Sequence, residues 1–170
     1  RMAASSYCKR LAFENDFRYY VDKYICSDIQ YFSFLRPINE VQIASLFAKN
    51  KEYYKVFKSC NVGSKTDSWC GKCPKCLFTW IIMSPFIPEN ELIEIFGKNL
   101  LKDNDLVPIM KQLKGEVEVK PFECVGTVEE VNACLNYGQR KSGLENLLNQ
   151  YDDANNLPKH FEQILKDKLQ

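Results

Sequence analysis

Four of the eight cysteines of this 170-residue chain lie within seventeen positions, in the segment SCNVGSKTDSWCGKCPKC. They are Cys60, Cys70, Cys73 and Cys76, with the spacing C-x9-C-x2-C-x2-C. A C-x2-C loop holds two thiolates at about the separation that a tetrahedral ion with metal–sulfur bonds of about 2.3 Å requires. A third cysteine at the same spacing extends the cluster, and Cys60 closes it from upstream. The spacing therefore predicts a four-thiolate metal site.

Other uses of these cysteines are disfavoured. No leader peptide opens the chain, so we expect a cytoplasmic protein in which thiols stay reduced rather than form disulfides. A thioredoxin-like pair would not need three cysteines in series. An iron–sulfur cluster also takes four cysteines and is the remaining alternative, although short tetrahedral cysteine knuckles favour zinc. Because protein fills all four positions, we expect a structural ion that offers no place to water or substrate.

The composition excludes several partners. Apolar residues make up 45% of the chain and charged residues 26%, which is an ordinary globular balance. A formal net charge of +1 gives no broad attraction to nucleic acid or to an anionic membrane surface. No apolar run reaches the length of a membrane span. We therefore expect neither a nucleic-acid partner nor a membrane partner.

The chain is predicted to have three parts and a mostly α-helical fold with a small α/β part. Residues 1–58 show helical periodicity around 11–26 and 38–49, and the aromatic-rich segment 29–35 is predicted to be a strand. One strand and helix unit cannot form a stable parallel sheet, so we expect its partner strands outside this chain. Residues 59–80 form the cysteine knuckle, and residues 81–170 form a helical region.

Start and stop signals mark the helices after the knuckle. Pro74 is placed to begin a helix, and Gly97 to end one that follows a first-turn proline. Thr127 and Glu130 have the spacing of a capping box. Two further amphipathic helices are predicted over residues 143–151 and 158–169. A brief strand is predicted within residues 115–126.

The remaining cysteines are mostly unremarkable. Cys26 and Cys134 lie in apolar helical patterns and are expected to pack as small hydrophobes. Cys124 differs because it follows Glu123 and precedes a capped helix, whose dipole favours a thiolate. A buried loop cysteine is the alternative. The single histidine, His160, is expected to face solvent, so no Ser-His-Asp or Cys-His arrangement can be built.

Several motifs in the same order resemble a known family. The segments YFSFLRPINEVQIASLFA, FKSCN, WCGKCPKCLFTW, SPFIP, EIFGKNLL and KPFECVGTVEEV are similar to the C-terminal part of the UDP-N-acetylmuramoyl-L-alanyl-L-glutamate epimerase family, roughly over residues 13–136. The resemblance implies a PP-loop ATP pyrophosphatase domain with a Rossmann-like fold, of which this chain would hold the C-terminal portion. It also implies inversion of the terminal L-glutamate of a UDP-muramoyl dipeptide to D-glutamate, with ATP and magnesium used and AMP and diphosphate released.

One motif of that superfamily is absent from this sequence. The nucleotide signature S-G-G-x-D-S occurs nowhere, and the segment NVGSKTDS inside the knuckle does not match it. We therefore expect the nucleotide-binding half to lie upstream of these residues, and the 170-residue chain alone to be inactive. Another PP-loop activity, or a zinc-knuckle module that binds nucleic acid or protein, is the alternative.

The chemistry of such an epimerase nominates five residues. Adenylation removes the charge of the glutamate carboxylate and makes the α-proton accessible to side-chain bases. Arg36 matches a carboxylate or phosphate bidentately, and Ser33 is grouped with it in substrate binding. Glu40, Glu123 and Cys124 are the acid–base candidates, and we expect Glu123 and Cys124 to lie near Ser33 and Arg36. A local ion pair is the alternative for Arg36 and Glu40.

Overall fold

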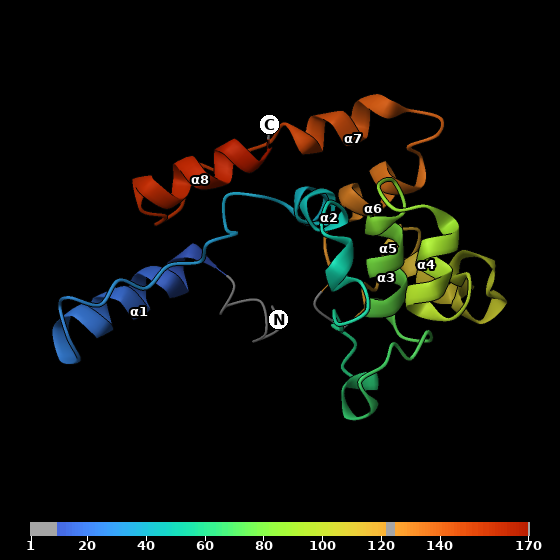
Figure 1. Ribbon diagram of the computed structural model, residues 1–170, viewed down its shortest axis with the longest axis horizontal. Coiled ribbons are helices and arrows are strands. Elements are labelled where there is room, and N and C mark those ends of the chain that lie inside the picture. The colour runs from blue at the N-terminus through green and yellow to red at the C-terminus, as the bar shows by residue number, and fades with distance from the viewer. Residues whose placement is uncertain (1–9, 122–124, 170) are drawn as a thin grey trace. The chain divides into compact units, whose positions relative to one another are not determined.

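The computed structural model describes residues 10–121 and 125–169, and this part of the chain is helical and contains no strand (Figure 1). It divides into two compact units. Unit 1 takes Arg1–Asn39 and Gln150–Gln170, and unit 2 takes Glu40–Asn149. The mostly α-helical class predicted from the sequence is confirmed, whereas the three-part division of the chain stays a prediction.

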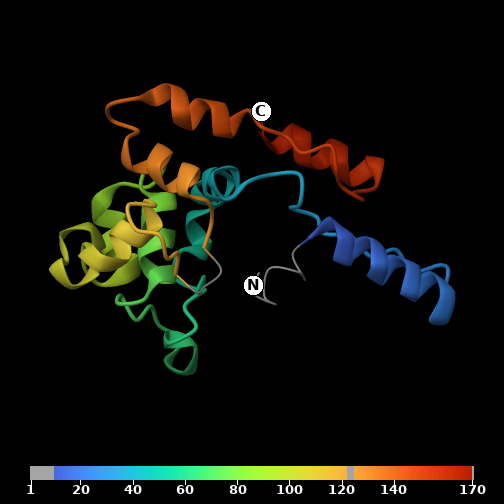
Figure 2. The same ribbon diagram turned by 180° about the vertical axis from the view of Figure 1, so that it is seen from behind.

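Unit 2 is built around one apolar helix, α3 (Pro74–Met83). In both views α3 lies among neighbours that contact it (Figures 1 and 2). The other helices of this unit are α2 (Glu40–Ala48), α4 (Glu89–Phe96), α5 (Val107–Leu113), α6 (Val128–Leu135) and α7 (Lys141–Leu148). Short 3-10 turns occupy Lys51–Tyr53, Gly63–Thr66, Leu100–Lys102 and Asn104–Leu106.

The predicted start and stop signals of these helices are confirmed. Pro74 is the first residue of α3, where its missing N–H costs no hydrogen bond. Gly97 follows α4 with a φ of 80°, a left-handed conformation that glycine adopts without strain. Thr127 and Glu130 form the capping box of α6 with both reciprocal hydrogen bonds. Local sequence chemistry therefore sets these three helix ends.

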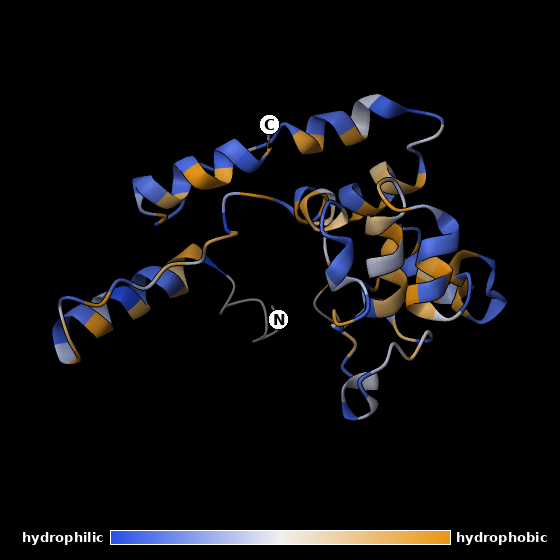
Figure 3. Cartoon of the chain, viewed as in Figure 1, coloured by the Kyte–Doolittle hydropathy of each residue, from blue (hydrophilic) through white to orange (hydrophobic). Residues whose placement is uncertain are grey.

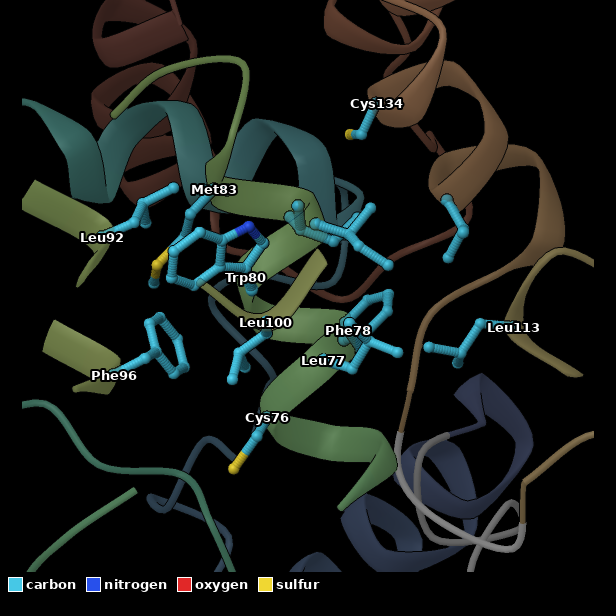
Figure 4. Close-up of a cluster of buried hydrophobic side chains, with 14 of the residues drawn as sticks. Cys76, Leu77, Phe78, Trp80, Met83, Leu92, Phe96, Leu100, Leu113 and Cys134 are labelled. Atoms are coloured by element: carbon cyan, nitrogen blue, oxygen red, sulfur yellow. The ribbon is translucent and has the colours of Figure 1, made fainter. Parts of the chain in front are cut away.

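The core of unit 2 runs along α3. Leu77, Trp80 and Ile81 have exposed fractions of 1% or less, and Leu92 and Phe96 pack around them (Figure 4). Cysteines of the knuckle belong to the same buried cluster, and Figure 4 shows Cys76 at one end of the row of α3 side chains. The knuckle is thus continuous with the hydrophobic core.

Unit 1 contains α1 (Leu11–Tyr24) and α8 (Lys159–Leu169), both amphipathic in the colouring of Figure 3. The chain turns back after α1 and runs alongside it, where Arg18 donates to the carbonyl oxygen of Tyr31 at 2.7 Å. Phe161 of α8 lies 5.3 Å from Phe32 between ring centroids. Aromatic contacts therefore join the three segments of this unit.

The strand predicted over residues 29–35 is wrong. The segment is irregular and then turns. The N–H of Arg36 donates to the carbonyl oxygen of Ser33, and the N–H of Ile38 donates to the carbonyl oxygen of Leu35. A strand needs a neighbour that accepts its backbone hydrogen bonds, and no strand lies in the described part of the chain. The aromatic residues pack on helices instead. The short strand within residues 115–126 is also absent from the described positions there.

No helix among the described residues is long and apolar enough to cross a membrane.

Candidate metal centre

The four predicted ligands come together in unit 2. The sulfur atoms of Cys60, Cys70, Cys73 and Cys76 all lie within 4.8 Å of one another. Three of the cysteines are buried, and Cys70 is partly exposed. Residues separated by up to sixteen positions in the sequence thus present four soft donor atoms to one point.

The sulfur–sulfur distances fit a tetrahedral ion. The Cys60–Cys73, Cys70–Cys76 and Cys73–Cys76 pairs are 3.9, 3.7 and 3.5 Å apart. Four ligands at about 2.3 Å from a central ion would be about 3.8 Å apart, whereas a disulfide would bring two sulfurs to about 2.05 Å. The cluster therefore has the dimensions of a thiolate metal site and not those of two disulfides.

Two ligands are positioned by the first turn of α3. Cys73 is the N-cap of this helix, and its sulfur accepts a hydrogen bond from the N–H of Cys76 at 3.4 Å. Pro74 fixes the backbone between them in a helical conformation. The positive end of the helix lies beside the sulfur of Cys73, and the Cys76 N–H lowers the pKa of that thiol, which offsets part of the opposite effect of burial.

The loop that carries Cys60 and Cys70 is tightly folded. The N–H of Gly63 donates to the sulfur of Cys60 at 3.2 Å. A Cβ atom at Gly63 would lie 1.8 Å from the carbonyl oxygen of Ser68, so this position has room for glycine alone. Asp67 adopts a left-handed conformation with a φ of 46°, which an aspartate tolerates better than most residues. The loop is therefore shaped by specific residues.

Trp69 anchors this loop in the core. Its ring lies 4.7 Å from that of Phe96 and 5.5 Å from that of Phe57, measured between centroids. Trp80 of α3 also packs on Phe96. The residue next to Cys70 in the sequence is thus held by the same aromatic cluster that surrounds α3, which ties both halves of the knuckle to one scaffold.

The electrostatics of the three buried thiols favour a bound cation. Burial raises the pKa of Cys73 to about 11 and raises that of Cys76 further. Burial acts in the same direction on Cys60, but backbone N–H groups of Cys70 and Gly63 outweigh it and lower the pKa of that thiol to about 7. Several buried thiolates so close together repel one another, and a divalent cation removes that repulsion.

The site has the donor set of a structural metal centre. Four cysteines are the ligands typical of structural zinc, and all four positions of a tetrahedral ion would be filled by protein. Such an ion would have no position for water or substrate, so its contribution is to hold the loop of residues 60–70 against α3.

Two predicted substrate-binding residues lie in unit 1, on a buried carboxylate. Arg36 Nε donates to Glu14 Oε2 at 2.8 Å, and the backbone N–H of Ser33 donates to the same oxygen at 3.2 Å. Asn156 donates to the other oxygen at 2.9 Å. Glu14 is 1% exposed. Arg36 therefore forms an ion pair with α1, and its predicted contact with substrate stays a prediction.

The acid–base candidates are placed only in part. Glu40 is exposed at the start of α2, and its backbone N–H donates to Glu130 Oε1 at 2.8 Å. Glu123 and Cys124 lie outside the described residues, so their predicted approach to Ser33 and Arg36 stays a prediction.

Sequence reasoning missed two buried acids. Glu130 was predicted only as half of a capping box, but its second oxygen also caps α2. Glu14 was not singled out at all. The sequence did carry a signal, because Glu14 shares one helix face with the apolar residues Leu11, Phe17 and Val21. A charge on a face that is expected to be buried needs a partner.

Comparison with known proteins identifies relatives of this chain. The family model for the MurL C-terminal domain matches residues 56–162. UDP-N-acetyl-alpha-D-muramoyl-L-alanyl-L-glutamate epimerase from Xanthomonas oryzae pv. oryzae is 40% identical over 133 residues, which cover 75% of this chain and 30% of that protein. The epimerase of the same name from Micromonospora sp. is 45% identical over 104 residues, 59% of this chain and 23% of that protein.

A third epimerase of that name, from Salinispora tropica, is 41% identical over 117 residues, 66% of this chain and 26% of that protein. The chain thus spans less than a third of the length of these curated relatives. No solved structure matches it. Because the family model covers more than half of the chain, including all four clustered cysteines, the chain belongs to the MurL C-terminal domain family.

Proposed function

We propose that this chain is the zinc-braced C-terminal part of an ATP-dependent epimerase, which converts the terminal L-glutamate of a UDP-muramoyl dipeptide to D-glutamate. The observation that carries the proposal is the family match together with relatives whose name states this epimerisation. The protein would then serve the synthesis of peptidoglycan precursors and would work in the cytoplasm, where UDP-linked precursors are made.

The zinc ion would be structural in this proposal. Cys60, Cys70, Cys73 and Cys76 would hold it, and the ion would supply rigidity rather than a Lewis acid. It would fix the loop of residues 60–70 beside α3 and so stabilise the fold of unit 2. Iron–sulfur chemistry is the alternative for the same four thiols.

ATP and magnesium would act outside the residues described for this chain. A phosphate cradle needs a glycine-rich loop at a helix N-terminus, and the seven glycines of the sequence are too far apart to form one. The 170-residue chain is therefore expected to release no AMP. Adenylation of the substrate carboxylate and the exchange of its α-proton would require the remaining part of the enzyme.

A chimeric enzyme tests this proposal. The region of the Xanthomonas epimerase that aligns with this chain is replaced by the 170-residue sequence, and formation of D-glutamate and AMP from the UDP-muramoyl dipeptide is measured. We expect turnover by the chimera and none by the chain alone. A folded, zinc-loaded chimera that binds the dipeptide but releases neither product would refute the proposed function.

Glu123→Gln, Cys124→Ser and Glu40→Gln in that chimera test the acid–base candidates. Loss of one proton-transfer group is expected to lower kcat by a factor of about 100 or more. Arg36→Lys keeps the charge but loses the bidentate geometry, and it is expected to weaken substrate binding only if Arg36 contacts the substrate.

A further inference from the structure

More large apolar side chains are exposed than buried among the described residues of unit 1. Its described residues expose eleven large apolar side chains, at Phe17, Tyr19, Tyr20, Tyr24, Ile25, Ile29, Tyr31, Phe34, Leu35, Phe161 and Ile164. They bury only four large apolar side chains, at Val21, Ile38, Leu157 and Leu165. A unit of about fifty described residues with so small a core gains stability when more of its apolar side chains are covered. Exposed aromatic side chains gathered in this way mark an interaction site.

The two faces of α1 have different roles. Glu14 and Val21 are buried, and the carboxylate of Glu14 is fixed by Arg36, Ser33 and Asn156 within the unit. That face of α1 therefore packs within unit 1. Tyr20 and Tyr24 form a second stripe, roughly 90° around the helix from the first, and Phe17 lies between the two stripes.

We define the aromatic face of α1 as Phe17, Tyr20, Tyr24 and Tyr31. Their exposed fractions are 36, 52, 67 and 40%. The rings are already ordered against each other, with centroids 5.2 Å apart for Tyr20–Tyr24 and 4.7 Å apart for Phe17–Tyr31. Tyrosine and phenylalanine are the residues enriched in the centres of protein interfaces, since they bury large area at low entropic cost.

The comparisons indicate what covers this face. The alignment with the Xanthomonas epimerase takes in 75% of this chain, more than residues 56–170 make up, so it must include residues before Val56. The family model of the C-terminal domain begins only at Val56. The aligned stretch therefore begins within α2 or earlier, and both α1 and α2 precede the residues that the family model matches, whereas 70% of the Xanthomonas protein lies outside the aligned region.

We infer that the aromatic face of α1 is the surface on which this remaining part of the epimerase packs. The inference rests on the proposed function, because it takes its occupant from the epimerase relatives. The matching surface would be apolar with hydrogen-bond acceptors at its rim for the phenolic hydroxyls of Tyr20 and Tyr24.

Tyrosine footprinting compares the 170-residue chain with the chimeric epimerase. Nitration by tetranitromethane is followed at each tyrosine by mass spectrometry. We expect Tyr20 and Tyr24 to react in the chain alone and to be protected at least tenfold in the chimera. Tyr53, which is 54% exposed in unit 2, is the matched control and should react equally in both. Equal reactivity of Tyr20 and Tyr24 in the two proteins would overturn the inference.

A second measurement does not depend on the chimera folding. The remaining part of the Xanthomonas epimerase is produced separately, and its binding to the 170-residue chain is measured by calorimetry. Tyr20→Asp with Tyr24→Asp should weaken binding at least tenfold, whereas Tyr53→Asp should leave it unchanged. Equal weakening by both, or no binding of the unsubstituted chain to a remaining part that circular dichroism shows to be folded, would count against the inference.

A second copy of this chain is the competing occupant of the aromatic face, and a measurement of self-association tests it. Sedimentation of the 170-residue chain alone is expected to show a monomer, and a dimer that the paired tyrosine substitutions dissociate would show that a second copy covers the face instead. Protection of Tyr20 and Tyr24 in a chimera without epimerase activity would support the docking face and reject the proposed function. The two proposals can therefore fail separately.

Discussion

Glu130 joins two helices through one carboxylate, so its removal should destabilise unit 2 strongly. Oε2 accepts hydrogen bonds from the N–H and hydroxyl of Thr127 at 2.6 and 2.9 Å, and Oε1 accepts one from the N–H of Glu40 at 2.8 Å. The side chain is 4% exposed. The same group thus caps both α6 and α2, which contact each other and α3.

The expected magnitude follows from the donors that lose their acceptor. In Glu130→Ala the backbone N–H groups of Glu40 and Thr127 lose their partner, at about 1–2 kcal/mol each when partly buried. The favourable contact of a negative charge with two helix N-termini is lost as well. We expect a loss of roughly 2–4 kcal/mol in the free energy of unfolding. For a unit of this size the midpoint of thermal unfolding should fall by roughly 10–20 °C.

Glu129→Ala is the matched control, because Glu129 is exposed in the same helical turn. Urea and thermal unfolding of the zinc-loaded proteins are followed by circular dichroism at 222 nm. Glu130→Gln should lie between the two alanine variants, since its amide oxygen can satisfy one donor while its NH₂ group faces the other. Midpoints of Glu130→Ala and Glu129→Ala that agree within about 0.5 kcal/mol would refute the double-cap reasoning.

Three further predictions concern the knuckle and the core. The purified chain should carry one zinc ion by mass spectrometry. Chelation or acidification to pH 5 should release the ion and unfold unit 2, because protons compete for the cysteine thiolates as the pH falls and bound zinc would contribute about 10 kcal/mol to folding. An unchanged circular dichroism signal of the helices after complete removal of zinc would contradict this. Gly63→Ala should weaken zinc affinity at least tenfold in a competitive chelator titration, because the new Cβ would meet the Ser68 carbonyl, whereas Gly138→Ala, with nothing within 4 Å of its Cβ, should have no effect. Cys134 should resist thiol reagents at pH 8 until the protein unfolds, since burial and nearby Glu130 raise its pKa to about 12; fast labelling of the native protein at this residue would show that the helix opens.

Features that depend on local chemistry could be predicted from the sequence. The cysteine spacing predicted which four sulfurs meet, and Pro74, Gly97 and the Thr127 capping box fixed helix ends, because each acts within a few residues of itself. The strand predicted over residues 29–35 is wrong because a strand needs a neighbouring strand to pair with. The sequence pattern of one segment does not reveal whether such a partner exists.

Buried charge also escaped prediction. Glu14 receives its partners from residues 33, 36 and 156, so nothing within its own helix indicates that the carboxylate is satisfied. The second hydrogen-bonding role of Glu130 spans ninety positions to Glu40 for the same reason. Interactions across long sequence separations follow from tertiary packing, which a single sequence does not display.

The start of α3 has a consequence for how this family can change over time. Two ligands and the central core helix share one segment, so loss of a single cysteine would leave three thiols around an incomplete site and would loosen the helix that the core surrounds. Single substitutions in the set are therefore strongly disfavoured as intermediate steps. Descendants should retain all four cysteines, or should replace the whole set together with a packed apolar knuckle that needs no ion.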